Sequence, residues 1–221
     1  MGEIKLPLLF KKGAEATLYL ADWHGRRVIL KKRLSKKYRP AKLDEQIRVY
    51  RTIHEPQLMN EAKRAGVSTP TIFLIDVENA TIIMEYVEGR QIKRLLGEVS
   101  RDERERLCMK IGEMIGRLHE HGLIHGDLTT SNMILNDCGR VFFVDFGLGE
   151  KNSELEARGV DLHLMKRALE SAHFQFADEC LASVIRGYSR VLRGTALRGV
   201  LDKIKEIERR GRYVAERKER N

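Results

Sequence analysis

The stretch Leu123–Gly149, LIHGDLTTSNMILNDCGRVFFVDFGLG, carries the densest chemical pattern in the chain. Asp127 and Asp145 each lie in a short polar turn beside apolar residues, and Asn132 follows Asp127 by five positions. Buried carboxylates are costly without cationic partners. Two Asp residues at the ends of a small apolar hairpin therefore predict a site for a metal ion and a polyphosphate. The apolar runs that predict the two strands of this hairpin are Asn132–Leu135 and Val141–Val144.

Length and composition predict a folded protein rather than a disordered one. The chain has 221 residues, of which 42% are apolar, enough for one core or two small lobes. No apolar run approaches the ~20 residues that span a bilayer, and the first residues lack a secretory pattern. We therefore expect no membrane segment and a cytoplasmic location. Cys108, Cys138 and Cys180 have no CxxC spacing, which favours reduced thiols packed as small apolar residues.

The formal net charge of +9 is unevenly distributed. Residues 26–51 contain eleven Lys/Arg against two acidic residues, and residues 198–221 contain nine against five. Two separate basic segments suggest a polyanionic partner, with nucleic acid as the first candidate. A solvated charged surface is the alternative that composition leaves open. Within the second segment, the residues expected to contact nucleic acid are Arg209, Arg210 and Arg212.

The N-terminal part, residues 4–31, predicts strands. Ala16–Asp22 and Arg27–Lys31 flank a His-Gly turn and predict a hairpin. Alternate side chains of a strand point to opposite faces, so Lys31 and Lys32 cannot both face inward; we favour Lys31. Gly13 precedes the hairpin, and without a GxGxxG pattern it indicates a turn and little more.

A helix is predicted over residues 43–65, and Pro56 is expected to divide it or to begin a second helix there. Glu55 and Glu61 both remain candidates for the acidic partner of Lys31. The apolar residues at helical spacing in this segment are Leu43, Ile47, Tyr50 and Ile53.

Two further strands, Thr71–Val77 and Ala80–Val87, lead into a turn at Glu88–Gly89. This turn is the expected link between two lobes. Ser100 and Glu103 form an S-x-x-E capping box at the start of a helix that continues to Gly122. Beyond Gly149 the spacing of apolar residues predicts three helices: residues 160–172, residues 174–192 and a segment from residue 197.

Asp127, Asn132 and the triplet Asp145-Phe146-Gly147 match the kinase catalytic loop H-x-D-x-x-x-x-N followed by D-F-G. More closely, HGDLTTSN with VDFGLG resembles the small atypical kinase subunit of the KEOPS complex, a PRPK-like and RIO-related Ser/Thr kinase family of archaeal type. The resemblance extends over nearly the whole chain. Its other segments are Gly13–Ala16, Lys31–Arg39, Arg51–Glu55, Gly159–Leu162 and the Arg-rich end.

The resemblance implies an α+β, two-lobed, minimal protein-kinase-like fold. Residues 1–88 would form an N-lobe with an antiparallel sheet and helices, and residues 89–221 a truncated helical C-lobe. The implied cofactors are ATP and Mg²⁺. Asp127 would orient or deprotonate the attacking group, Lys31 held by Glu55 would position phosphates, and Asn132 with Asp145 would hold Mg²⁺. The implied nucleotide contacts are Gly13, Ala14, Glu15, Lys31, Glu55, Met84, Glu85, Val87, Asn132 and Asp145.

Departures from the ordinary kinase pattern narrow the expected activity. Gly126 replaces the Arg of H-R-D, no A-P-E follows Gly147, and Asp161 comes only 14 positions later. We therefore expect constitutive nucleotide binding and weak or atypical protein phosphorylation. Pro56 also departs from the smaller residue typical of this family.

The family implies three partners: the KEOPS threonylcarbamoyl transferase subunit that modifies adenosine 37 of tRNA, a further small KEOPS subunit, and tRNA itself. Two other functions remain open. One is a small-molecule phosphotransferase of the aminoglycoside or choline kinase type, although the chain after Asp145 is short for its acceptor-binding region. The other is a nucleotide-binding scaffold, against which the intact Lys31, Asp127, Asn132 and Asp145 argue.

Overall fold

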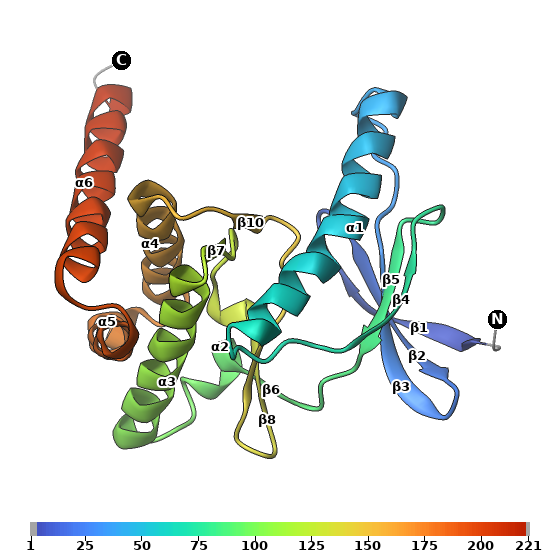
Figure 1. Ribbon diagram of the computed structural model, residues 1–221, viewed down its shortest axis with the longest axis horizontal. Helices are drawn as coiled ribbons and strands as arrows, with labels where there is room; N and C mark the ends of the chain where they lie inside the picture. Colours follow the sequence, from blue (N-terminus) through green and yellow to red (C-terminus); the bar gives the residue numbers. More distant parts are fainter. Residues whose placement is uncertain (1–3, 220–221) are drawn as a thin grey trace.

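The computed structural model describes the backbone of residues 4–219 and the side chains of residues 7–210. Figure 1 shows a sheet with one long helix at one end of the molecule and a group of helices at the other. The elements in chain order are β1 (Ile4–Lys12), β2 (Thr17–Trp23), β3 (Arg26–Lys32), α1 (Ala41–Arg64), β4 (Ile72–Asp76), β5 (Thr81–Glu85), β6 (Gly89–Gln91), α2 (Ile92–Leu95), α3 (Arg101–Glu120), β7 (Leu123–Ile124), the 3₁₀ turn η1 (Thr130–Asn132), β8 (Met133–Asn136), β9 (Val141–Phe143), β10 (Glu150–Lys151), α4 (Leu155–Ala172), the 3₁₀ turn η2 (Phe174–Phe176), α5 (Ala177–Val191) and α6 (Gly194–Glu219).

The N-terminal sheet has the strand order β1-β2-β3-β5-β4, with every neighbouring pair antiparallel. β3 is its central strand, and Lys31 is paired there with Leu18 on one side and Ile82 on the other. The side chain of Lys31 is buried while that of Lys32 is exposed, as the alternation of a strand requires. The predicted two-part α+β architecture is confirmed.

Helix α1 corrects the prediction that Pro56 divides this segment. The helix is continuous from Ala41 to Arg64 with Pro56 inside it. Proline has no N–H, so it leaves the Thr52 carbonyl without the usual backbone donor. Pro56 and its neighbours Glu55 and Leu58 are buried against the rest of the molecule. Most helical stability in proteins comes from such packing, which here outweighs the missing bond.

The predicted apolar stripe of α1 is not its buried face. Leu43, Tyr50 and Ile53 are exposed. The helix instead buries Leu58, Met59 and Ala62 in the main core and turns Glu55 toward β3. Apolar spacing therefore predicted the helix correctly, but tertiary contacts decided which side of it faces inward.

Short strands between the two ends of the molecule carry the loops of the Leu123–Gly149 stretch. β8 and β9 form the predicted hairpin, and β8 also pairs with β6, which makes a three-stranded sheet. β7 pairs with β10. Met133 and Phe143 on this hairpin are fully buried. Val144 N–H donates to the Asn132 carbonyl at 2.9 Å, which ties the end of β9 to the start of β8.

The C-terminal helices pack around α3, whose predicted capping box is present in full. Gly112 of α3 and Gly187 of α5 allow these two helices to meet backbone to backbone. A Cβ atom on Gly187 would lie 1.8 Å from the Met109 carbonyl oxygen, and one on Gly112 would lie 1.9 Å from that of Val184. α4 and α6 complete this part, and their apolar residues share one core with the sheet side.

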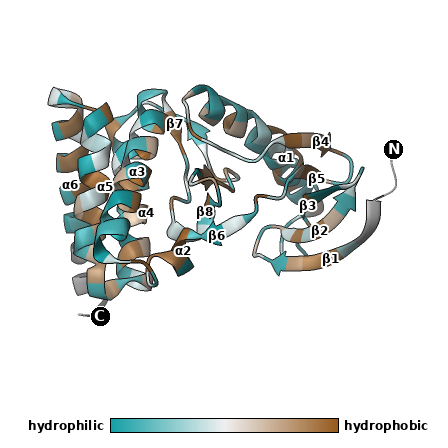
Figure 2. Cartoon of the chain, turned by 90° about the horizontal axis from the view of Figure 1, so that it is seen from below, coloured by the Kyte–Doolittle hydropathy of each residue, from teal (hydrophilic) through white to brown (hydrophobic). Residues whose placement is uncertain are grey.

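Two observations concern the surface. Cys138 is exposed, so the expectation that all three thiols pack inside holds only for Cys108 and Cys180. Figure 2 colours part of β1 hydrophobic, where Leu8, Leu9 and Phe10 are exposed on the edge strand of the sheet. Within residues 4–219, no helix has both the length and the apolar character that crossing a bilayer requires.

Candidate active site

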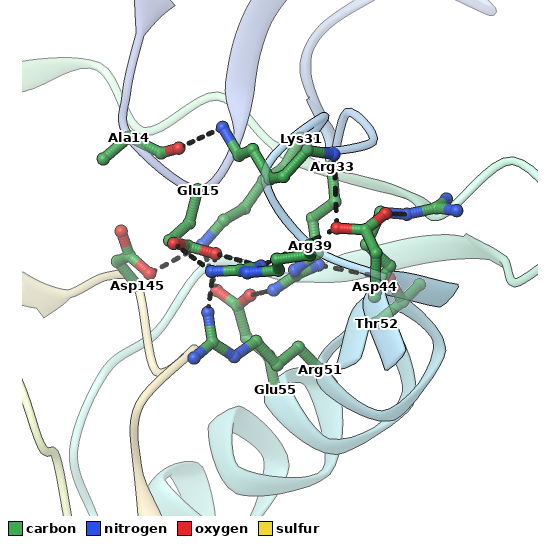
Figure 3. A network of polar contacts seen from close by, with 12 residues as sticks. Ala14, Glu15, Lys31, Arg33, Arg39, Asp44, Arg51, Thr52, Glu55 and Asp145 are labelled. Carbon is green, nitrogen blue, oxygen red and sulfur yellow. Dashed lines mark hydrogen bonds and ion pairs between the residues drawn. The ribbon is translucent and has the colours of Figure 1, made fainter. Parts of the chain in front are cut away.

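Lys31 lies at the centre of a cluster of charged side chains between the sheet and α1 (Figure 3). Its Nζ donates to Glu55 Oε1 and to Asp145 Oδ1, each at 2.7 Å. Asp145 is 114 positions further along the chain. Burial alone lowers the pKa of a lysine, but the carboxylates of Glu55 and Asp145 outweigh it and hold the pKa of Lys31 above its ordinary value. The ammonium group is therefore charged and directed at both carboxylates.

Arg33 is a second cation on the same glutamate, and the sequence patterns had assigned it no role. Its guanidinium donates to Glu55 Oε2 and, at 3.3 Å, to Thr52 Oγ1. Arg33 follows Lys31 by two positions, so strand alternation could have indicated a shared face. The cluster contains two cations and two carboxylates, which satisfies the requirement that buried charges be paired.

Glu61, the other candidate partner of Lys31, lies elsewhere. Its carboxylate accepts from His121 Nε2 at 3.3 Å and pairs with Lys151 and Arg64. Glu55 is therefore the partner of Lys31 and Glu61 is not, although helical spacing alone allowed either of them.

Asp145 has an unusual backbone conformation for a non-glycine residue, with φ of 66°. Such conformations cost energy and persist where the surroundings hold them. Partial burial would raise the pKa of Asp145, but the neighbouring Lys31 ammonium lowers the pKa below its ordinary value. About half of the side chain remains exposed. Asp145 is thus an ionised carboxylate that both contacts Lys31 and faces solvent.

The turn before β2 is held closed by the basic segment that follows β3. Gly13 N–H donates to the Ala16 carbonyl at 2.9 Å, and Lys36 Nζ donates to the Ala14 carbonyl. The Glu15 carboxylate accepts from Arg39 and Arg51, each at 2.9 Å. The hydrogen bond from Arg39 lowers the pKa of Glu15. Glu15 therefore faces these arginines, and it fixes the turn against α1 (Figure 3).

The loop after β7 carries Asp127 and Asn132. Asn132 Nδ2 donates to the Asp127 carbonyl at 3.0 Å and to its Oδ2 at 2.8 Å. Asp127 N–H in turn faces Nδ1 of the buried His125 at 3.3 Å. Both the carboxylate and the carbonyl of Asp127 are thereby oriented by Asn132, five positions later.

Asp161 of α4 fixes this loop from behind. Its fully buried carboxylate accepts from the backbone N–H groups of His125 and Gly126, both at 2.9 Å, and lies 3.2 Å from His119 Nε2. His119 Nδ1 lies 3.0 Å from the Tyr188 hydroxyl. Although burial raises the pKa of a carboxyl group, these partners lower that of Asp161. From the sequence, Asp161 was identified only as part of a family motif, and no pattern indicated a role for His119.

Gly126 occupies the place of the usual kinase arginine because no larger residue fits. Its φ is 78°, and a Cβ atom there would lie 2.1 Å from the Leu148 carbonyl oxygen. The close approach brings the loop after Asp145 directly onto the loop before Asp127.

The residues expected at the adenine edge lie at the end of β5. Met84 is buried in the main core. Glu85 N–H donates to the Thr71 carbonyl at 2.8 Å, and its carboxylate accepts from Thr71 N–H at 2.9 Å. Val87 is also buried. These contacts join the end of β5 to Thr71, the residue just before β4. The segment that leads from β5 to β6 begins immediately after them.

The donor set suits Mg²⁺ only together with a phosphate ligand. Among residues 4–219, no group of three or more His, Cys, Asp or Glu could hold a metal ion by itself. Asn132 turns its Nδ2 toward Asp127, which leaves Oδ1 free to coordinate, and Asp145 keeps a partly exposed carboxylate. Mg²⁺ is commonly bound by one or two such oxygen donors plus substrate phosphates and water.

Much of the first basic segment is engaged within the protein. Lys31 and Arg33 are buried, and Arg39, Arg48 and Arg51 pair with Asp44 or Glu15. In the second segment Arg209 is exposed and Arg210 pairs with Glu156. The side chain of Arg212 lies outside the described side chains. The formal charge of residues 26–51 thus overstates the basic surface available to a polyanion.

Comparison with known proteins places these features in a family. The protein kinase domain family matches residues 12–180. The chain is 45% identical to the KEOPS complex subunit Bud32 of Pyrococcus abyssi, over 93% of this chain and 96% of that protein. It is 44% identical to a probable bifunctional tRNA threonylcarbamoyladenosine biosynthesis protein of Methanothermobacter thermautotrophicus, over 94% of this chain but 37% of that protein. The chain therefore spans little more than a third of this longer relative.

A solved structure shows the same fold at lower sequence identity. The Rio2 kinase of Chaetomium thermophilum, in its complex with ADP, Mg²⁺ and phosphoaspartate, is similar with a TM-score of 0.61. The sequences are 17% identical, and the match covers 90% of this chain and 70% of the other.

Proposed function

Because the chain belongs to the protein kinase family and, within it, to the family of the KEOPS subunit Bud32, we propose that it binds Mg-ATP and transfers or releases its terminal phosphate. The acceptor is water, the protein itself or an associated protein. The observation that carries this proposal is Lys31, whose ammonium lies 2.7 Å from both Glu55 and Asp145.

The Lys31 ammonium group, which Glu55 and Asp145 share, would bind the nucleotide phosphates. Glu55 holds Lys31 from the α1 side, while Asp145 approaches it from the loop after β9. Lys31 would contact the α- and β-phosphates of ATP, as kinase lysines do. Phosphoryl transfer depends mainly on such positioning and charge neutralisation.

Asp127 is the group that would orient the attacking hydroxyl or water, or accept its proton. Its carboxylate is held by Asn132 at 2.8 Å. Asn132 and Asp145 would hold Mg²⁺, which when bound would neutralise charge on the phosphates. Asp161 fixes the backbone of this loop through the N–H groups of His125 and Gly126, and is therefore a positioning residue.

The adenine would lie at the end of β5, with Met84 at its wall and the backbone of Glu85 and Val87 as partners. The turn containing Gly13, Ala14 and Glu15 would cover the phosphates. Glu15 holds this turn in place through Arg39 and Arg51. The division into residues 1–88 and 89–221 follows from placing the nucleotide between these two parts.

We further propose that the chain works as a KEOPS subunit in the cytoplasm. In this role it supports threonylcarbamoylation of tRNA adenosine 37 together with the transferase subunit and a further small subunit. The names of its relatives support this assignment. Arg209, Arg210 and Arg212 would contact tRNA within the assembly.

Phosphate release and autophosphorylation should be measured with Mg-ATP, with and without the transferase subunit. Asp127→Ala and Asp145→Ala should each lower the rate by about 10³-fold. Asp137→Ala is the matched control, because this exposed aspartate lies on the β8–β9 turn. Unchanged turnover in both site variants would refute the proposed activity. Stimulation by choline or an aminoglycoside, in place of the transferase, would favour a small-molecule phosphotransferase.

The proposed tRNA contact has its own test in the assembled complex. Replacing Arg209 and Arg212 by Ala should weaken tRNA binding and reduce the salt dependence by about one unit of slope for each phosphate that the variant no longer binds. Arg90→Ala is a control at β6, where Arg90 pairs with Glu98. Equal affinity and slope in both variants would show that the C-terminal arginines are solvated charges.

A further inference from the structure

Two of the three cysteines lie on the helices that meet most closely. Cys108 is on α3 and Cys180 is on α5, and both are 1% exposed. Ideal Cβ atoms on Gly112 and Gly116 would approach the carbonyl oxygens of Val184 and Tyr188, respectively. The contacts thus advance by four positions on both helices. Four positions before Gly112 and Val184, on the preceding turn of each helix, the same register places Cys108 opposite Cys180.

The close approach of the two helices makes a covalent link between these cysteines geometrically accessible. A Cβ atom on Gly112 would lie 1.9 Å from the Val184 carbonyl oxygen, so the backbones are in direct contact one turn away from the cysteines. Disulfides need Cα atoms within about 4.4–6.8 Å. One turn before the cysteines, the Arg104 guanidinium of α3 lies 3.8 Å from the ring centroid of Phe176, which directly precedes α5. The two thiols are therefore neighbours without any rearrangement of the helices.

A cavity of about 230 Å³ reaches one of the two thiols. It is lined by Cys180, Ser183 and the side chains of Arg101, Arg104 and Arg186, but not by Cys108. The Arg101 and Arg186 side chains are more than half exposed, so they form the solvent side of the cavity. Cys180 lines the cavity although only 1% of the residue is exposed. A small reagent can thus approach Cys180, with Cys108 lying behind it.

The pKa values of the two thiols are shifted in opposite directions. The hydrogen bond from Cys108, and then the guanidinium of Arg104, lower the pKa of Cys180. The same hydrogen bond, together with burial, raises the pKa of Cys108. Arg104 is fixed by bonds to the Leu96 and Val99 carbonyls at 2.9 and 3.1 Å. Arg101 and Arg186 pair with Glu179 and Glu105, so the rim is nearly neutral.

We propose that Cys108 and Cys180 form a redox-active dithiol that reacts with small-molecule disulfides through the cavity and closes into a disulfide joining α3 to α5. The Cys180 thiolate attacks one sulfur of the reagent, whose S–S bond breaks and releases one thiol. Cys108 then loses its proton to solvent and attacks the sulfur of Cys180, which releases the second thiol. The two cysteines are oxidised by two electrons, and the reagent is reduced by two electrons to two thiols.

The test uses the native full chain with Cys138 replaced by Ala, because Cys138 is exposed and would react by itself. The probe is 4,4′-dithiodipyridine, a small neutral disulfide that releases a coloured thiopyridone. We expect two thiopyridones per protein, no pyridyl group left on the protein, and a peptide containing Cys108 cross-linked to one containing Cys180. The reaction should be at least about tenfold faster than reaction of the same thiols through global unfolding.

Single variants in the same background separate the two roles. With Cys108→Ala, one thiopyridone should be released and one pyridyl group should remain on Cys180. With Cys180→Ala, reaction at Cys108 should slow by about tenfold or more. Two retained pyridyl groups in the parent protein, faster reaction at Cys108 than at Cys180, or reaction only at the unfolding rate would each overturn the proposal. The retained pyridyl groups and the comparison with the unfolding rate are both measured on the parent protein, so they decide the proposal even if a variant fails to fold.

Discussion

Glu55 and Asp161 are both buried carboxylates, but opposite kinds of partner hold them. Glu55 accepts from two cations, Lys31 and Arg33. Asp161 accepts from two backbone N–H groups and lies against His119. Neither is more than 1% exposed. One region thus balances charge against charge, and the other satisfies a charge with peptide groups and a ring nitrogen.

The difference separates an adaptable region from a fixed one. Lys31 is shared between buried Glu55 and half-exposed Asp145, so under the proposed function an arriving phosphate would take up part of its interaction. The peptide N–H groups bound to Asp161 cannot move without moving the loop that carries Asp127. We therefore expect substitutions around Glu55 to change nucleotide use, and substitutions around Asp161 to weaken the whole fold.

The largest expected effect comes from Asp161→Asn. The amide replaces one acceptor oxygen with a donor, which leaves a buried backbone N–H unpaired and removes the charge that faces His119. The free energy of unfolding should fall by about 3 kcal/mol, measured by urea denaturation. Asp137→Asn on the exposed β8–β9 turn should change it by less than about 0.5 kcal/mol. Equal values for the two variants would contradict the proposed role of Asp161.

Glu55→Gln should come next, with a loss of about 2–3 kcal/mol in unfolding free energy. The change leaves the buried Lys31 and Arg33 with a neutral partner. It should also raise the KM for ATP, because Lys31 is then held from one side only. Glu61→Gln on the same helix is the matched control, since this residue pairs with surface groups. If Glu61→Gln lowered the unfolding free energy as much as Glu55→Gln, the ion pair between Glu55 and Lys31 would have no specific effect on stability.

The buried His125 should make the stability of the protein depend on pH, by at most about 1 kcal/mol. Burial lowers its pKa, with nearby carboxylates opposing the effect. Between its folded pKa and the unfolded value of about 6.5, only the unfolded state takes up a proton, so stability is lost as pH falls. Lowering the pH from 7 to 5.5 should lower the unfolding free energy by at most about 1 kcal/mol through this group. The variant His125→Phe keeps a ring beside Phe146. Urea denaturation of this variant at pH 7 and at pH 5.5 should no longer show the part of the difference that comes from His125. If the pH dependence were unchanged, His125 would be excluded as its source.

Glu15→Gln should have the smallest effect. The amide weakens the contacts with Arg39 and Arg51 that hold the turn before β2, and surface pairs contribute little to folding. We expect unfolding to be nearly unchanged and the KM for ATP to rise about threefold, equivalent to roughly 0.6 kcal/mol. Glu15→Asp should recover part of the loss. A change in kcat alone would argue that Glu15 does not act by positioning the nucleotide-covering turn.

Local patterns determined much of this protein. The period of two in β3 placed Lys31 and Lys32 on opposite faces, and the Ser100–Glu103 capping box began α3 where it was expected. The spacing of Asp127, Asn132 and Asp145 indicated the kinase family, to which the chain belongs. The strand alternation and the capping box depend on residues within a few positions of one another, and the kinase motif lies within the single stretch Leu123–Gly149, so sequence patterns could reveal all three.

Only the tertiary structure decided which distant residues meet. It bonded Lys31 to Glu55, which helical spacing had not separated from Glu61, and added Arg33 to the same carboxylate. It turned α1 so that Leu43, Tyr50 and Ile53 are exposed, kept the helix continuous through Pro56, and left Gly126 no space for a side chain. Lys31 meets Asp145 across 114 positions. Such contacts follow from the packing of whole elements and the pairing of buried charges, which no short stretch of sequence encodes.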